Sequence, residues 1–294
     1  MTETIPVSGQ PAWRSMLERW ALYMPPGRPS ERDVWVFRER LLAALEARPQ
    51  VSAAAPAAVL VLGSTPELRS MLAALPQVKV TVIDYLLPML EAMSELVTGD
   101  LQTETWVKGD WIEAPLAPGH FDAVVSDLVL ANLPTERQHR LGARVAELLA
   151  PGGHWINRVD CVDQNSLFLD LDQLLERFIS LGDTSQSTVC YLRACGGLRY
   201  WDPVSGYQSW KGFGEALSRY RDDERFVHPS PVANELMQAV WAITYPFDKP
   251  YWLQRKADLD HMLGEYFTIE FEELDLDAAR HHERGYYVYD LKVR

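Results

Sequence analysis

A strand, a glycine turn and a helix start, all within residues 57–75, form the stretch of this chain best suited to bind a ligand. Residues 59–62 are continuously apolar, which is typical of a strand buried on both faces of a parallel sheet. Gly63 ends this run, and residues 65–67 follow as a helix start in which the Thr65 hydroxyl is expected to accept from backbone N–H groups. Such a turn leaves unpaired N–H groups at the carboxyl edge of a sheet, where nucleotide ligands bind in open α/β folds.

Asp84 is the second residue whose position points to chemistry. It ends another apolar run, residues 78–83, and follows Gly63 by about twenty residues. That interval separates the glycine turn from the acid that accepts ribose hydroxyls in nucleotide-binding βαβ units. A helix-forming sequence follows at residues 88–96, so capping of that helix is the alternative role for the Asp84 carboxylate.

The alternation of short apolar strands with amphipathic helices predicts an α/β fold with a doubly wound, mostly parallel sheet. Two alternating segments near the end predict an antiparallel hairpin on the sheet edge. The strands are expected at 59–62, 78–83, 103–108, 121–126 and 154–159, and the hairpin at 267–276 and 286–294. Further helices are expected at 11–23, from Ser30 onward and at 167–181.

Three parts are expected from this pattern. They are an N-terminal helical cap at 1–50, a core made of 51–163 and 254–294, and a substrate-binding insertion or lid at 164–253. The insertion is too long to be a mere connection, and it is loaded with aromatic residues.

Composition limits the classes of partner. The formal net charge is -13 and no Lys/Arg cluster is present, which argues against nucleic acid and favours a small-molecule substrate. No apolar stretch approaches the length of a membrane span, and the amino terminus lacks the features of a signal peptide. We therefore expect a cytoplasmic protein without membrane contact, and leave a homodimer open.

The residue types of metal sites occur without metal-site spacing. The three cysteines are Cys161, Cys190 and Cys195, with no CxxC pair, and are expected to be reduced thiols. The histidine pair at 281–282 lacks a third metal ligand. Asp160 and Asp163 are expected to cap a strand end, and His154 is expected to be structural. No metal is predicted.

Five segments of the chain resemble, in order and spacing, the motifs of class I S-adenosylmethionine-dependent methyltransferases. They cover about residues 57–160 and read VLVLGSTPE, TVIDYLLPML, KGDWIEAPL, FDAVVSDLVLANLP and LLAPGGHWINRV. The resemblance implies a seven-stranded Rossmann-like fold, S-adenosylmethionine as cofactor, and methyl transfer to a small-molecule acceptor by O- or N-methylation. It also implies that the loop at 63–65 contacts the methionine part, that Asp84 binds the ribose hydroxyls, and that Asp110 with Trp111 holds the adenine.

The cofactor-binding set expected from this resemblance is Gly63, Ser64, Thr65, Glu67, Asp84, Tyr85, Gly109, Asp110, Trp111, Asp127, Leu128 and Tyr23. Asp127 and Leu128 would face the donor methyl and the acceptor.

The glycine loop departs from the family pattern, which has an acid two residues before the first glycine and further glycines at alternate positions. This chain has Val61, Thr65 and Glu67 at those places. Glu67 is either a substitute for the acid or a residue that favours the helix dipole. The departure motivates the rival interpretation, a non-catalytic or repurposed protein of the same fold. A nicotinamide-dependent oxidoreductase shares the Gly63 and Asp84 geometry but would require a GxGxxG turn.

Two groups of residues are candidates for the chemistry. Asp127 lies just past a strand at the ligand edge and is expected to position or deprotonate the acceptor, with capping of the next turn as the alternative; Asn132 is a weaker candidate in the same loop. Aromatic residues either fill the core of the cap or line a pocket for a planar or cationic acceptor, such as an aromatic acid or an amine. The aromatic candidates are Trp20, Trp201, Tyr207, Trp210, Tyr245 and Trp252.

Overall fold

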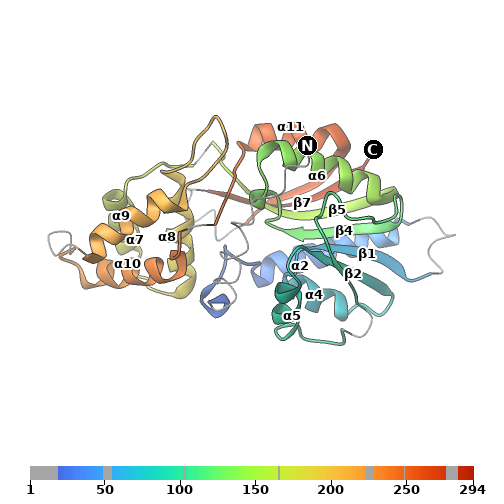
Figure 1. Ribbon diagram of the computed structural model, residues 1–294, viewed down its shortest axis with the longest axis horizontal. Coiled ribbons are helices and arrows are strands. Elements are labelled where there is room, and N and C mark those ends of the chain that lie inside the picture. Colours follow the sequence, from blue (N-terminus) through green and yellow to red (C-terminus); the bar gives the residue numbers. More distant parts are fainter. Residues whose placement is uncertain are drawn as a thin grey trace.

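A computed structural model describes residues 19–48, 55–101, 104–164, 166–222, 228–247, 249–275 and 284–294. Its centre is a seven-stranded sheet with the order β3-β2-β1-β4-β5-β7-β6 (Figure 1). The strands are β1 Ala57–Leu62, β2 Val78–Asp84, β3 Thr105–Lys108, β4 Phe121–Asp127, β5 Leu149–Cys161, β6 Phe267–Leu274 and β7 Gly285–Val293. The predicted doubly wound, mostly parallel sheet is confirmed.

Strand β1 lies in the middle of the parallel part because both of its faces are apolar. It pairs in parallel with β2 on one side and with β4 on the other. Val59, Leu60 and Val61 are completely buried, so the strand contributes side chains to the cores on both faces of the sheet. The chain continues from β1 to β2 and β3 on one side of the sheet, and then returns to place β4 and β5 on the other side of β1. Ligands bind at such a switch point in open α/β sheets.

Helices cover both faces of the sheet (Figure 1). Helices α6 (Thr135–Leu148) and α11 (Lys256–Tyr266) lie on one face, and α2 (Glu31–Glu46), α4 (Pro66–Ala73) and α5 (Leu87–Ser94) lie on the other. Each layer closes its own apolar cluster against the strands. This arrangement leaves the carboxyl ends of β1, β2 and β4 free to carry loops.

The last two strands form the predicted antiparallel hairpin. Strand β7 inserts between β5 and β6 and is antiparallel to both. The loop that joins the two strands is described only up to residue 275 and from residue 284, so the pair of histidines at 281–282 lies outside the described residues.

Four helices form a separate layer to one side of the sheet (Figure 1). They are α7 (Leu171–Leu181), α8 (Gln186–Leu198), α9 (Trp210–Asp222) and α10 (Pro231–Thr244). Their facing sides build a core of their own, in which Leu175, Phe178 and Leu192 are completely buried. The same cluster also includes Tyr286 of β7 and Val162, which follows β5, so the layer packs against this end of the sheet.

Local details differ from the expectations in three places. The long helix expected from residue 167 begins only at Leu171, because Asp170 caps it and its carboxylate accepts from Gln173 N–H at 2.9 Å. Helix α4 starts after Thr65 without the expected side-chain cap, and Pro66 removes one of the N–H groups that a cap would serve. Of the helix expected at 11–23, only residues from 19 onward are described, and Trp20–Leu22 form a short 3-10 turn there.

No helix in the described ranges is both long and apolar enough to cross a bilayer.

Two helical glycines should respond oppositely to alanine. A Cβ at Gly196 in α8 would overlap the buried ring of Phe213 in α9, whereas a Cβ at Gly264 in α11 would meet nothing within 4 Å. We expect Gly196→Ala to lower the free energy of unfolding by about 1–3 kcal/mol through overpacking. Gly264→Ala should raise it by about 0.5–1 kcal/mol through helix propensity. Urea unfolding of both variants checks this, and equal effects would contradict the α8–α9 packing.

Candidate active site

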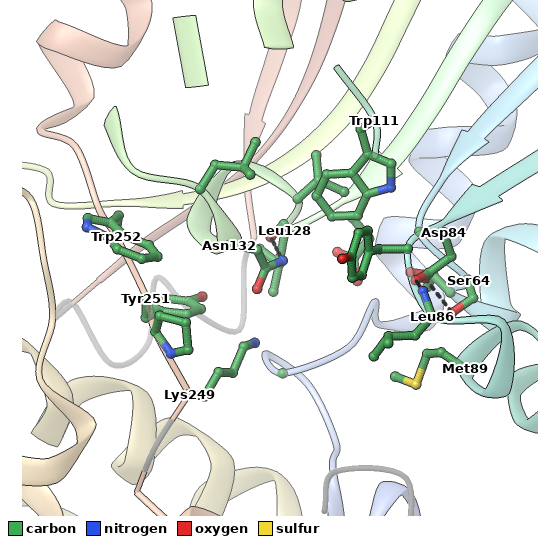
Figure 2. A pocket seen from close by; sticks show the side chains of 18 of the residues that line it. Ser64, Asp84, Leu86, Met89, Trp111, Leu128, Asn132, Lys249, Tyr251 and Trp252 are labelled. Atoms are coloured by element: carbon green, nitrogen blue, oxygen red, sulfur yellow. Dashed lines mark hydrogen bonds between the residues drawn. The ribbon is translucent and has the colours of Figure 1, made fainter. Parts of the chain in front are cut away.

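A cavity of about 560 Å³ opens at the carboxyl ends of β1, β2 and β4 and extends toward the helical layer (Figure 2). All of the residues predicted to bind the cofactor, except Glu67, line this cavity. The helical layer and the N-terminal segment supply the opposite wall through residues such as Trp210 and Tyr23. Segments that are far apart in sequence thus line one cavity.

The turn after β1 depends on one glycine. Gly63 has a φ of 83°, which an L side chain rarely adopts, and its N–H donates to Ile83 O at 2.9 Å. The next residue, Ser64, is buried, and its hydroxyl donates to Asp84 Oδ2 at 3.1 Å. Thr65 has a φ of -52°, so the position where the family has a second glycine requires no left-handed backbone here.

Asp84 lies at the end of β2 and faces the cavity (Figure 2). Its Oδ1 atom accepts from Leu86 N–H at 2.9 Å. Burial raises the pKa of this carboxyl to about 6, although hydrogen bonds from Leu86 and Ser64 lower it. Helix α5 begins after Leu86 and has no side-chain cap, so Asp84 holds the turn before the helix rather than capping the helix itself.

The loop after β3 places a carboxylate and an indole at one end of the cavity. Asp110 accepts from Ile112 N–H at 2.9 Å and pairs with Arg137 at 2.7 Å. Trp111 donates its indole N–H to Ile83 O at 3.1 Å, which fixes the ring beside the β1 and β2 ends. A flat apolar surface next to a carboxylate can hold a planar heterocycle with amino groups.

Asp127 lies at the end of β4 and is paired with a buried arginine. Arg158 Nε donates to Asp127 Oδ1 at 2.7 Å, and the Asp127 side chain is only 7% exposed. Burial raises the pKa of the Asp127 carboxyl to about 6, although the positive charge of Arg158 lowers it. Arg158 also forms an ion pair with Asp33. A carboxylate with such a pKa can accept a proton near neutral pH from a bound molecule that lies within hydrogen-bond distance.

Leu128 has a φ of 52°, which is unusual for a residue other than glycine. Its N–H donates to Arg158 O at 2.8 Å, and its carbonyl accepts from Asn132 Nδ2 at 3.0 Å. Strained backbone of this kind persists where the surroundings fix it, often at functional sites. Asn132 also lines the cavity, and its buried Oδ1 has no hydrogen-bond partner among the described residues.

The N-terminal segment forms a wall of the site. Tyr23 donates its hydroxyl to Ile243 O in α10 at 2.9 Å, and Trp20 stacks beside it with the ring centroids 6.1 Å apart. Glu67, in the first turn of α4, forms an ion pair with Arg28 of this segment and lies outside the cavity. The expected contact of Glu67 with the cofactor is therefore not supported by its position.

The aromatic candidates separate into two groups. Trp20, Trp210 and Trp252 line the cavity. The other three do not, because each packs elsewhere. Trp201 stacks on Phe168, Tyr207 packs against the edge of Trp252, and Tyr245 stacks on Trp241 in α10.

Several lining residues were not anticipated from the sequence, namely Arg193, Lys249, Tyr251 and Arg284. The only local signal was the aromatic and proline-rich stretch around residue 250. Tyr251 and Arg284 both bind the Asp160 carboxylate, which is buried. The expectation that Asp160 caps a strand end was wrong, since a buried carboxylate needs stronger partners than a turn provides.

The other metal-type residues have structural surroundings. His154 is buried with its Nδ1 atom 2.6 Å from Asp290 Oδ1, as expected for a structural histidine. All three cysteines are buried free thiols. The described residues contain no group of three His, Cys, Asp or Glu side chains able to hold a metal ion.

Residues 61–153 match a family model described as a methyltransferase domain. No curated protein sequence is significantly similar to the chain. The family match confirms the resemblance inferred from the five motifs.

Solved structures that are similar to the chain include the following three. A Rhodobacter sphaeroides protein, provisionally described as one of the Zn-dependent alcohol dehydrogenases, has a TM-score of 0.57 at 19% identity and covers 99% of this chain and 100% of its own. The N-methyltransferase NodS from Bradyrhizobium japonicum, solved with S-adenosyl-l-homocysteine, has a TM-score of 0.46 at 13% identity, covering 94% and 96%. Geranyl diphosphate C-methyltransferase from Streptomyces coelicolor has a TM-score of 0.47 at 11% identity, covering 95% and 89%. At these identities only the fold is compared, and only the first TM-score exceeds 0.5.

Replacing Asp84 with Asn should change how folding stability depends on pH. The folded-state pKa of about 6 lies above the usual 3.8, so the native carboxyl holds its proton more tightly than the unfolded one. Deprotonation between pH 4 and pH 6 therefore destabilises the wild type, whereas the amide has no charge to bury. The stability of Asp84→Asn relative to wild type should rise by up to about 3 kcal/mol from pH 4 to pH 7 in urea unfolding.

The matched control is Asp202→Asn. Asp202 is exposed, and the hydrogen bond from the Ser205 hydroxyl lowers the pKa of its carboxyl. Its removal should not produce a relative gain in stability with rising pH. Parallel pH profiles for Asp84→Asn and wild type would contradict the buried state of Asp84.

Proposed function

We propose that this chain, whose residues 61–153 form a methyltransferase domain of the class I S-adenosylmethionine-dependent type, methylates an oxygen or nitrogen atom of a small molecule. S-adenosylmethionine is the cofactor of this domain. The observation that carries the proposal is the single cavity that runs from Ser64 and Asp84 past Asp127 to the wall of Trp210. One enclosed volume can then hold both the cofactor and an acceptor.

The residues present fit this cofactor. The Gly63 turn gives an open backbone approach at the end of β1, because its φ of 83° favours a residue without a side chain. Asp84 directs a carboxylate with remaining acceptor capacity into the cavity, which suits ribose hydroxyls. Asp110 and Trp111 supply a carboxylate and a flat ring for adenine.

We assign the three parts of the chain as follows. The core at 51–163 and 254–294 holds the cofactor, while the cap at 1–50 and the insertion at 164–253 enclose the acceptor. Support comes from the cavity wall, to which Trp20, Cys190 and Trp210 contribute. When bound, S-adenosylmethionine supplies an electrophilic methyl group on a sulfonium. The surrounding residues contribute by orienting the acceptor and excluding water.

Asp127 and Asn132 are placed to act on the acceptor. Asp127 can hold or take a proton at Oδ2, since its Oδ1 is bound by Arg158. Asn132 Oδ1 is a buried acceptor without a protein partner among the described residues, so it can receive a hydrogen bond from a hydroxyl or amine. Orientation by these two groups is the catalysis that we assign to the protein.

Calorimetry with S-adenosylmethionine and S-adenosylhomocysteine tests the proposal, with NADH as the counter-ligand. Asp84→Ala should weaken binding of the first two about ten-fold or more while the protein stays folded, because charge-assisted hydrogen bonds are worth roughly 1.5–3 kcal/mol each. The control variant Asp258→Ala removes an exposed acid from the first turn of α11 and should bind normally.

Other outcomes point to the rival functions. No binding of either sulfur compound up to millimolar concentration would favour a repurposed protein of this fold. Tight binding of NADH alone would favour a nicotinamide-dependent oxidoreductase. If Asp84→Ala bound both sulfur compounds with unchanged affinity but had a lowered melting temperature, Asp84 would have only a structural role, in the turn before α5.

A further inference from the structure

The acceptor end of the cavity contains an arginine, Arg193, that pairs with no carboxylate of the described residues. The guanidinium of Arg193, in α8, lies 4.0 Å from the ring centroid of Trp210 and 5.6 Å from that of Tyr23. In the part of the chain that the structure describes, Arg193 forms no ion pair, and its buried Nε has no hydrogen-bond partner. The two rings hold the charge in the cavity wall without neutralising it.

The neighbouring Arg284 differs because its charge is balanced. It forms an ion pair with Asp160 and donates to Ala194 O at 3.0 Å and Gln208 Oε1 at 3.1 Å. Asp160 is thereby committed to Arg284 and to the hydroxyl of Tyr251. Both contacts are to Asp160 Oδ2, and among the described residues no ion pair joins Asp160 to Arg193.

Lys249 adds a second cation to the same end of the cavity, and Figure 2 shows its side chain pointing into the open space. Burial, together with the charges of Arg193 and Arg284, lowers the pKa of Lys249 to about 7, although the charges of Asp160 and Asp127 raise it. The Lys249 ammonium also lies 5.1 Å from the ring centroid of Tyr251. A desolvated group of cations of this kind is stabilised by a bound anion.

We infer that the acceptor is a planar aromatic carboxylic acid, whose carboxylate is held by Arg193 and Lys249. This inference rests on the proposed function and deepens it. A guanidinium offers the forked donors that match a carboxylate, and Lys249 completes the charge balance. The aromatic body lies against the rings of Trp210, Tyr251 and Trp252, which line the same wall.

The orientation of the acceptor follows from the distribution of charge. Asp127 is a buried carboxylate that lines the same cavity, and it repels a second carboxylate. The nucleophilic hydroxyl or amine of the acid therefore faces Asp127 and Asn132, while its carboxylate faces α8. The chain as a whole is acidic, with a net charge of -13, so the cations at this end of the cavity attract an anion to this place and not to the protein surface in general.

Matched pairs of probes test the inference by binding alone. Benzoate, 4-hydroxybenzoate and indole-3-carboxylate are compared with their carboxamides, by tryptophan fluorescence and calorimetry, with and without S-adenosylhomocysteine. At least one carboxylate should bind about ten-fold or more tightly than its amide. Absence of this preference in every pair would overturn the inference.

Variants locate the carboxylate. Arg193→Gln and Lys249→Gln should each reduce the preference for carboxylate about ten-fold, and Arg193→Lys should retain part of it. The matched controls are Arg199→Gln, at the exposed C-cap of α8, and Lys211→Gln, which is exposed in α9; both should behave as wild type. A preference that survives in Arg193→Gln and Lys249→Gln would overturn the assignment.

Proton uptake gives a second readout, which a merely structural role of Lys249 would not produce. A carboxylate beside Lys249 raises the pKa of the ammonium, so binding at pH 7.5 should take up a fraction of a proton. Calorimetry in two buffers of different ionisation enthalpy measures this uptake, and Lys249→Gln should abolish it. Carboxylate binding without S-adenosylhomocysteine binding would contradict the methyltransferase function and leave the anion site standing.

Discussion

The buried guanidinium of Arg158 is the interaction on which the geometry of the site depends. It is completely buried on β5, and an isolated charge there would be strongly destabilising. It is bound by Asp127 at the end of β4, by Asp33 in the first turn of α2 at 3.5 Å, and by Pro26 O at 3.1 Å. One side chain therefore fixes the end of a strand, the start of a helix and the N-terminal segment relative to one another.

A second charged group, two residues further along β5, repeats this arrangement. Successive alternate residues of a strand point to the same face, so Asp160 projects toward the same region as Arg158. Asp160 forms an ion pair with Arg284, which precedes β7, and accepts a hydrogen bond from the hydroxyl of Tyr251, which follows the helical layer. The walls of the cavity are thus tied to the sheet by ion pairs and hydrogen bonds. Such contacts set orientation more narrowly than apolar packing does, because they depend on direction as well as distance.

The sequence was sufficient for features that depend on neighbouring residues. The strands, the positive φ at Gly63 and the position of Asp84 all follow from patterns within about twenty residues. The choice among the aromatic residues was not accessible in this way. Trp201 and Trp252 look equivalent as sequence, yet only Trp252 reaches the cavity. The difference arises from contacts between segments far apart in the chain, such as the bond from Trp201 Nε1 to Leu253 O at 3.1 Å.

Arg158 and Arg284 were also invisible to pattern reasoning. Each occurs in the chain without a nearby acid at helical spacing, and their partners lie 31 and 124 residues away, at Asp127 and Asp160. Buried charges of this kind become recognisable only when the fold brings the partners together.

The altered glycine loop acquires a physical explanation from the same contacts. Only Gly63 adopts a left-handed backbone, so a side chain at Thr65 costs no strain, and helix α4 begins normally with Pro66. The third position, Glu67, pairs with Arg28, whose guanidinium also lies 5.6 Å from the ring centroid of Trp20. A carboxylate at this position therefore links the loop after β1 to the N-terminal wall of the cavity, which a glycine could not do. The departure from the family pattern is thus coupled to the N-terminal segment that encloses the site.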